Sequence, residues 1–390
     1  MALPSFDQAC PSPPPAVVNR GAARACPRAR LDVDEVRGVF DATDPFTIGL
    51  EEEVLLVDPA THAPAPVAAE VVRAAGGDAR IKQELPACQV ELLTRPHRSV
   101  EGARDELAAA RAALIRACDG VVAPAAAAVH PWAPATTAVG PSERHRAIED
   151  DFGEVARRQL IGALQVHVAL GTADCTLAVY NALRGYLPEI AALAAAAPFY
   201  EGRDTGLASV RPVIAGQLPR QGVPPVLESW DAFVDHLEWG TASGTVPEPR
   251  RWWWELRPHV IHGTLEVRVP DVQPTVAASA AVAETVYALI RHLAQRHHDG
   301  EALDAHPTWR IAENRWCALR DGIHGRLADL ESGEAIPTRR RLRDIFDQIE
   351  PHSEAGLDAA RAVTEHTAAD QLRQAGLRGA TGWLIEAFHH

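Results

Sequence analysis

The fold is decided by one stretch of the chain, Phe46-Thr-Ile-Gly-Leu-Glu-Glu-Glu-Val-Leu-Leu-Val-Asp58. Its apolar residues predict strands over 46–50 and 54–57, on either side of three consecutive glutamates. Successive side chains of a strand point to opposite faces of a sheet, so Glu51 and Glu53 share one face. We therefore expect a sheet that has one apolar face and one acidic face.

The same alternation recurs in four later segments, 89–94, 164–170, 252–257 and 264–269. In each segment apolar side chains on one face alternate with polar ones on the other. The polar residues are Gln89, Glu91, Gln165, His167, Glu255, Arg257, Glu266 and Arg268. Long Ala-rich helices are predicted over 99–122, 176–196, 275–295 and 354–373. Clustered strands with long helices between them predict an α+β fold whose sheet has one helix-covered face.

The polar face has two interpretations. An antiparallel sheet often exposes one face to water, which would make these residues a solvated surface. However, solvated faces favour Lys, Thr and Ser, whereas these positions hold carboxylates and arginines. Glutamates placed side by side cost energy unless a cation lies among them, and oxygen ligands without Cys suit Mg²⁺ or Mn²⁺. Such a face, with arginines as phosphate clamps, suits phosphoryl transfer from a nucleotide.

Composition excludes other classes of protein. The chain has 390 residues and a net charge of −14, which argues against a general nucleic-acid binder or a protein docked on anionic lipid. Lys82 is the only lysine among 38 basic residues, so a Walker loop and a kinase β3 lysine are both excluded. The six cysteines form no CxxC pair, and neither a secretory signal nor a membrane span is evident, which predicts a cytoplasmic protein.

The chain is expected to divide at residue 43. Residues 1–43 are rich in Pro, Ala and Arg and predict a disordered tail, whereas 44–390 read as a single catalytic domain.

Six motifs in colinear order, from about 45 to 375, give the chain a family likeness. The opening strand quoted above resembles that of the glutamate–cysteine ligase type 2 family, the YbdK-like carboxylate-amine ligases. The other motifs are Lys82-Gln-Glu-Leu85 with Gln89-Val-Glu-Leu92, Pro198-Phe-Tyr-Glu-Gly-Arg-Asp-Thr-Gly-Leu-Ala-Ser-Val-Arg211, Arg251-Trp-Trp-Trp-Glu-Leu-Arg-Pro258, Gly263-Thr-Leu-Glu-Val-Arg-Val-Pro-Asp-Val-Gln-Pro274 and Glu313-Asn-Arg-Trp316.

The resemblance implies a glutamine-synthetase-like fold, in which a curved, mainly antiparallel sheet forms a funnel with helices packed on its outer face. It implies a glutamate–cysteine ligase: ATP phosphorylates the γ-carboxylate of glutamate, and the amine of cysteine attacks the γ-glutamyl phosphate. The substrates are small molecules, and a homo-oligomer is compatible with the resemblance. Two alternatives stay open: a ligase that joins glutamate or another carboxylate to a different amine, and a catalytically weak paralogue that binds a ligand.

The resemblance also implies roles for individual residues. Glu53 and Arg268 are the expected catalytic residues, and Arg268 would stabilise the transferred phosphoryl group. Arg211 and His167 are expected to bind substrate. The expected metal ligands are Glu51, Glu53, Glu84, Glu91 and Glu266, and the expected nucleotide-binding residues are Arg257, Arg268, Arg315 and Gln165.

One motif departs from the family pattern. The usual His-x-His strand reads Gln165-Val166-His167, so glutamine replaces an expected metal ligand. The amide oxygen of Gln165 could still bind Mg²⁺, or the change could alter metal affinity, rate or substrate. The glycine that usually follows this strand is Ala169.

Overall fold

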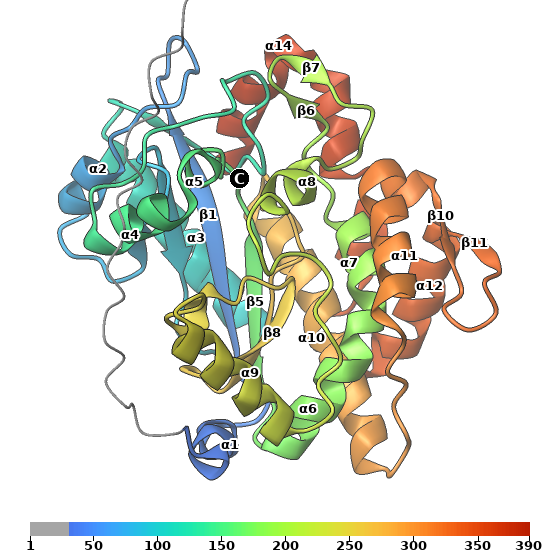
Figure 1. The fold of residues 1–390 in the computed structure, drawn as a ribbon. Coiled ribbons are helices and arrows are strands. Elements are labelled where there is room, and N and C mark those ends of the chain that lie inside the picture. The colour runs from blue at the N-terminus through green and yellow to red at the C-terminus, as the bar shows by residue number, and fades with distance from the viewer. Residues whose placement is uncertain (1–30) are drawn as a thin grey trace, which may run out of the picture. The chain divides into compact units, whose positions relative to one another are not determined.

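A computed structural model describes residues 31–390, and its central feature is a seven-stranded sheet (Figure 1). The strands lie in the order β2-β3-β1-β5-β9-β8, with β4 paired to β1, and every pairing is antiparallel. Their bounds are β1 Ile48–Val57, β2 Ile81–Gln83, β3 Gln89–Leu93, β4 Ala123–Ala125, β5 Leu164–Ala169, β8 Leu256–His259 and β9 Thr264–Val267. Two separate hairpins pair β6 (Phe199–Tyr200) with β7 (Arg203–Asp204) and β10 (Arg326–Ala328) with β11 (Ala335–Pro337).

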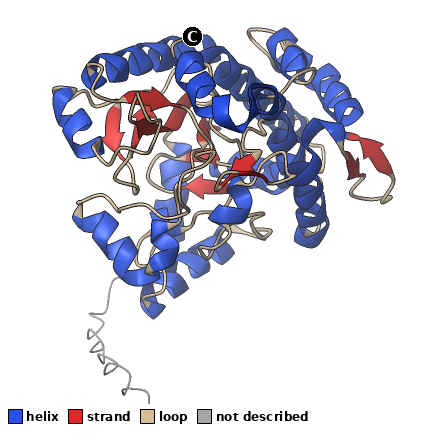
Figure 2. Ribbon diagram, turned by 90° about the horizontal axis from the view of Figure 1, so that it is seen from above, coloured by secondary structure: helices blue, strands red, loops and turns tan. Residues whose placement is uncertain are grey.

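Helices surround the strands, as the view from above shows (Figure 2). Their bounds are α1 Val33–Asp41, α2 Ala68–Ala74, α3 Val100–Cys118, α4 Glu143–Phe152, α5 Glu154–Arg157, α6 Ala173–Leu183, α7 Leu187–Leu193, α8 Arg211–Ala215, α9 Trp230–Ser243, α10 Val276–His298, α11 Thr308–Asp321, α12 Thr338–Ile349, α13 Asp358–Val363 and α14 Ala368–Phe388. Among these, α3, α6 and α10 pack directly against strands of the sheet.

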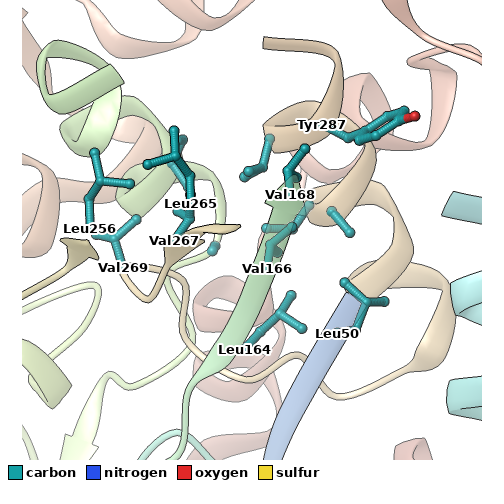
Figure 3. Close-up of a cluster of buried hydrophobic side chains, with 14 of the residues drawn as sticks. Leu50, Leu164, Val166, Val168, Leu256, Leu265, Val267, Val269 and Tyr287 are labelled. Carbon is teal, nitrogen blue, oxygen red and sulfur yellow. The ribbon is translucent and has the colours of Figure 1, made fainter. Parts of the chain in front are cut away.

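The apolar face of the sheet is buried against helices, as the alternation predicts. Leu164, Val166 and Val168 of β5 are fully buried, as are Leu265 and Val267 of β9. Figure 3 shows these side chains gathered with Tyr287 of α10. The polar residues of the same strands must therefore face the other way.

Several predicted elements differ in their bounds. The two strands predicted around the glutamates are one continuous strand, β1, because the central Glu52 is neutralised on the helix-covered face. The strand predicted from 252 begins only at Leu256. Residues 252–254 follow a short 3-10 helix, Pro249–Arg251, without regular structure, and Arg257 binds the carbonyl oxygens of Arg250 and Trp252 there. The helix predicted over 176–196 is two helices, α6 and α7, and the one predicted over 354–373 is α13 followed by α14.

The predicted tail is wrong for the part of it that the structure describes. Residues 33–41 form helix α1, which Asp32 caps and which packs against α6 and α9. Its Phe40 is fully buried, with its ring 4.7 Å from that of Trp230. The turn at Gly263 fits closely under this helix, because a Cβ there would lie 2.4 Å from the carbonyl oxygen of Val39. Residues 1–30, the rest of the predicted tail, lie outside the described residues.

Residues 31–390 form one compact unit. Within this range, no helix combines the length and the apolar character that crossing a membrane requires.

Candidate active site

The predicted polar residues of the sheet meet in cross-strand pairs on the face opposite the core. Glu51 of β1 lies opposite Gln165 of β5, and Glu53 lies opposite Glu91 of β3. Directly opposed residues of an antiparallel pair have side chains on the same face within about 5.5 Å. The acidic residues therefore lie close together, as the alternation predicts.

A second set of pairs continues the polar face onto the late strands. His167 lies opposite Glu266, which in turn lies opposite Arg257. The Nδ1 atom of His167 is 3.0 Å from the hydroxyl of Thr264, and its Nε2 atom is 3.3 Å from Oε1 of Glu51 without alignment for a hydrogen bond. The imidazole is thus fixed between the two predicted metal ligands Glu51 and Glu266.

The carboxylates of this face have divergent acidities. Burial and the nearby charge of Glu84 raise the pKa of Glu53 to about 7. Burial and the charge of Glu51 raise the pKa of Glu91 well above its usual range. Burial acts against the charge of Glu51 as well, yet the adjacent His167 lowers its pKa to about 2. Carboxylates that repel one another in this way are relieved by a cation.

These residues fit a divalent cation in their chemistry. Glu51, Glu53 and Glu91 supply oxygen atoms of the kind that Mg²⁺ and Mn²⁺ bind. Among residues 31–390, no three His, Cys, Asp or Glu side chains already converge as a metal site. Binding a metal would therefore require side chains to turn toward it.

Glu266, another predicted metal ligand, is held by two arginines. Its oxygens accept hydrogen bonds from Nε and Nη2 of Arg257 at 2.5 and 3.1 Å, and one of them also accepts from Arg268. Burial opposes the charge of Glu266, but the two guanidinium groups hold its pKa well below the usual range. Glu266 is thus ionised and engaged in ion pairs on this face.

Gln165 links the acidic and basic parts of the face. Its Nε2 donates to Oε1 of Glu53 at 2.9 Å, and its Oε1 accepts a hydrogen bond from Arg268. The amide oxygen that the sequence offers as a metal ligand is therefore occupied by Arg268.

Arg211 and Arg315 are already paired with carboxylates. Nε of Arg211 binds Asp271 at 2.6 Å and its Nη2 binds the carbonyl oxygen of Val269 at 2.6 Å. Arg315 makes two bonds to Glu255, at 2.8 and 2.9 Å. Arg211 still lines a cavity, whereas Arg315 reaches it only through Glu255. It remains a prediction that Arg211 contacts the substrate directly and that Arg315 contacts the nucleotide.

Two cavities open on the polar face. The smaller has a volume of about 120 Å³, and its lining includes Glu53, Glu84, His145, Arg211, Glu255 and Arg268. The larger has a volume of about 1150 Å³, and its lining includes Glu51, Lys82, His167, His262 and Thr264. The carboxylates of β1 lie between them, because Glu51 lines one cavity and Glu53 lines the other.

The sequence analysis missed two histidines and one ion pair. His259 and His262 stack with ring centroids 4.4 Å apart, and both rings lie within 6 Å of His167. Burial lowers the pKa of His259 to about 3, so that ring is neutral. The His-x-x-His spacing across the β8–β9 turn was the available signal.

The missed ion pair joins Glu52 to Arg111 on the opposite, helix-covered face. Nε and Nη2 of Arg111 each bind a Glu52 oxygen at 2.9 Å, and both side chains are at most 2% exposed. The signal was an arginine within the apolar stripe of α3, between Leu107 and Leu114.

Comparison with known proteins agrees with this geometry. A sequence model described as glutamate-cysteine ligase family 2 matches residues 47–387. The chain belongs to this family. A relative from Rubrobacter xylanophilus, named "Putative glutamate--cysteine ligase 2-3", is 34% identical and covers 89% of this chain and 98% of its own. A relative from Thermobifida fusca, named "Putative glutamate--cysteine ligase 2", is 30% identical, with coverage of 87% and 88%.

Solved structures share the fold. The glutamate–cysteine ligase of Francisella tularensis, solved in complex with AMP, aligns with a TM-score of 0.68 at 14% identity, covering 89% of this chain and 90% of that one. A bifunctional glutathione synthetase from Pasteurella multocida aligns with a TM-score of 0.60 at 16% identity, covering 91% of this chain and 54% of that one. The predicted fold class is confirmed, and family membership confirms the predicted activity class, an ATP-dependent carboxylate–amine ligase.

Proposed function

We propose that this member of glutamate–cysteine ligase family 2 joins the γ-carboxylate of glutamate to the amine of cysteine, with Mg²⁺ as the metal. The observation that supports this most directly is the ordered contact of Arg268 with Gln165 and Glu266 beside the carboxylates of β1. An arginine beside carboxylates that could hold a metal ion suits transfer of a phosphoryl group to an acid, since both would stabilise the charge on the transferred group.

The reaction proceeds in two displacements. An oxygen of the glutamate γ-carboxylate forms a bond to the γ-phosphorus of ATP, and ADP leaves. The acceptor ammonium first loses one proton to give the free amine. Its nitrogen then forms a bond to the acyl carbon, inorganic phosphate leaves, and a second proton is lost, so that the amide keeps one N–H. Arg268 is placed to stabilise the charge that develops on the transferred phosphoryl group, since its guanidinium is held by two acceptors before substrate arrives.

Glu51, Glu53 and Glu91 would hold the metal, with Glu84 and Glu266 as further ligands. When bound, Mg²⁺ supplies charge neutralisation for the phosphate oxygens. His167 orients Glu51 through their 3.3 Å approach, and its own position is fixed by Thr264.

The two cavities differ in a way that suits two classes of substrate. The larger, of about 1150 Å³, has room for a nucleotide. The smaller, of about 120 Å³, suits an amino acid. Its lining includes Arg144 for a carboxylate and Glu84 for an ammonium group, whereas Arg211 and Glu255 are already paired with Asp271 and Arg315. A substrate γ-carboxylate held near Glu53 and Arg268 would then meet the nucleotide at the boundary between the cavities.

The position of Gln165 favours a second candidate, a family member with weak or altered catalysis. Its amide oxygen is taken by Arg268, so it offers the metal no atom where the family usually has histidine. In this candidate the protein binds nucleotide and a carboxylate but turns them over slowly.

The test is ADP release by the purified protein with ATP, Mg²⁺ and glutamate, offered a panel of free amines that includes cysteine. We expect release that requires both glutamate and cysteine. Release with another amine alone would keep the ligase chemistry and overturn cysteine as the acceptor. Tight ATP binding without release for any amine would overturn the glutamate–cysteine assignment in favour of the second candidate.

A further inference from the structure

The larger cavity is lined by four basic residues, of which one differs from the other three. Each arginine already has a carboxylate partner: Arg80 pairs with Asp78 at 2.6 Å, Arg95 with Glu106 at 3.0 Å, and Arg98 with Asp44 at 2.7 Å. The fourth is Lys82, which is exposed and makes no side-chain hydrogen bond or ion pair within residues 31–390. Among these four residues, Lys82 is thus the one without a carboxylate partner in the described part of the chain.

Register places Lys82 on the face where the chemistry is proposed. On β2, Lys82 lies opposite Glu91 of β3, and Glu91 lies opposite Glu53 of β1. Directly opposed residues of antiparallel strands project from the same face, so all three belong to the polar face. Lys82 stands at its outer edge, where the larger cavity opens.

Lys82 faces His262 across the larger cavity. Burial is the main reason that the pKa of His262 is lowered; the charge of His167 acts in the same direction, and that of Lys82 adds a smaller contribution. His262 also lines the larger cavity. Lys82 and His262 therefore face the same cavity, from β2 and from the β8–β9 turn.

The residue type is also informative. The chain holds 38 basic residues, of which Lys82 is the only lysine, so 37 are arginines. An ammonium is a compact charge on a flexible stem, whereas a guanidinium is a planar fork that suits fixed two-point contacts. A flexible point charge suits a polyphosphate chain that changes shape as one phosphate is transferred.

We propose that Lys82 binds the phosphate chain of ATP in the larger cavity. This rests on the proposed assignment of that cavity to the nucleotide. Before ATP binds, the ammonium is hydrated and free, and on binding it forms charge-assisted hydrogen bonds with phosphate oxygens. Lys82 adds a binding contact to those of Arg268 and the metal ligands.

A single lysine makes the experiment selective. A water-soluble N-hydroxysuccinimide ester of acetate modifies amines, so in this chain it reports Lys82 and the terminal amine, which serves as the internal standard. Mass spectrometry follows the rate of acetylation at each, with Mg²⁺ present and with ATP, AMP or glutamate added. We expect ATP to slow acetylation of Lys82 about tenfold, because one charge-assisted contact is worth about that factor, and AMP and glutamate to leave it unchanged.

Variants separate binding from folding. Lys82→Gln should raise the Kd for ATP about tenfold and leave the Kd for AMP unchanged, while Lys82→Arg should restore part of the loss. Arg95→Gln is the matched control, since Arg95 lines the same wall but is paired with Glu106, and it should bind ATP as the parent does.

The outcomes distinguish this inference from the proposed reaction. Unprotected Lys82 in a protein that binds ATP would overturn the role of Lys82 and leave the ligase intact, as would equal protection by AMP. Protection by ATP in a protein that releases no ADP with any amine would support Lys82 and overturn the glutamate–cysteine assignment.

Discussion

The side-chain amide of Gln165 donates a hydrogen bond to Oε1 of Glu53 across 2.9 Å, joining β5 to β1 on the polar face. The same amide accepts from Arg268, so a neutral group separates the carboxylate from the guanidinium. Glu53 consequently lacks a direct arginine partner, unlike Glu266. Burial and the charge of Glu84 raise the pKa of Glu53 to about 7, as expected for a buried carboxylate without an ion-pair partner.

Replacing Gln165 with histidine tests whether this position limits the reaction. In Gln165→His an imidazole nitrogen becomes available to a metal and the bridge from Arg268 to Glu53 is lost. We expect turnover to rise about tenfold and half-saturation with Mg²⁺ to fall, as for a restored metal-site group. The exposed Gln217→His is the control. Unchanged turnover in Gln165→His would refute a limiting role for this residue.

Removing the charge of Glu53 tests the metal assignment. Glu53→Gln keeps the shape of the side chain and its contact with Gln165, but it takes one negative oxygen from the cluster. We expect Mg²⁺-dependent binding of ATP to weaken by about 100-fold, measured by calorimetry with and without Mg²⁺. Glu70→Gln, on the exposed surface of α2, should bind as the parent does. Parental binding by Glu53→Gln would contradict a role in holding the metal.

The buried pair of Glu52 and Arg111 predicts a stability effect without a direct effect on chemistry. Arg111→Met leaves Glu52 charged and unpaired in the core, which should lower the free energy of unfolding by about 3–5 kcal/mol. Urea denaturation measures it, with the exposed Arg116→Met on the same helix as the control.

A double variant separates the two contributions. Replacing both members, in Glu52→Leu with Arg111→Met, removes the unpaired charge and should cost less than Arg111→Met alone. If the double variant lost as much free energy of unfolding as Glu52→Leu and Arg111→Met lose together, packing and not charge would dominate the stability of this pair.

Because of His130, we expect the free energy of unfolding to fall in acid. Burial lowers its pKa to about 4, and its Nδ1 accepts from the backbone N–H groups of Trp132 and Ala133. Between pH 4 and pH 6.5 the imidazole of His130 is protonated in the unfolded chain, where its pKa is near 6.5, but it stays neutral in the folded chain. Stability from this group is therefore complete above pH 6.5 and is lost as the pH falls toward 4.

The expected loss from His130 is about 2 kcal/mol between pH 6.5 and 4.5. Urea midpoints of the parent and of His130→Gln, taken across this range, measure it. The variant should start less stable but lose less on acidification. Parallel pH profiles would contradict the assignment.

Period-two patterning predicted much of the sheet and its polar face. Leu164 to Leu170 alternates so regularly that both faces of β5 could be assigned from residue types, and the structure agrees. The pattern misplaced the start of β8, since the tryptophans at 252–254 lie in an irregular segment in which Arg257 binds the carbonyl oxygen of Trp252. Alternation describes a chain that is already extended and cannot show where a distant side chain ends the strand.

What the sequence could not provide was the pairing of charges. Arg211, Arg257 and Arg315 all appeared as site arginines, yet each is bound to a different acidic residue, and only register and helix position decide which. Helix α1 was missed for a similar reason. Its nine residues are too few to be stable alone, and its stability comes from contacts with α6 and α9 that lie far along the chain.

The alternation along β1 has a consequence for how this protein can change over time. Glu52 closes an ion pair in the core while Glu51 and Glu53 face the cavities, so neighbouring residues serve opposite sides of one sheet. Losing or gaining a single residue within the strand would put two glutamates into the core and turn the Arg111 partner outward. Contacts on both faces of the sheet thus fix the register of β1. Substitutions can accumulate in this strand, but insertions and deletions must fall in the loops.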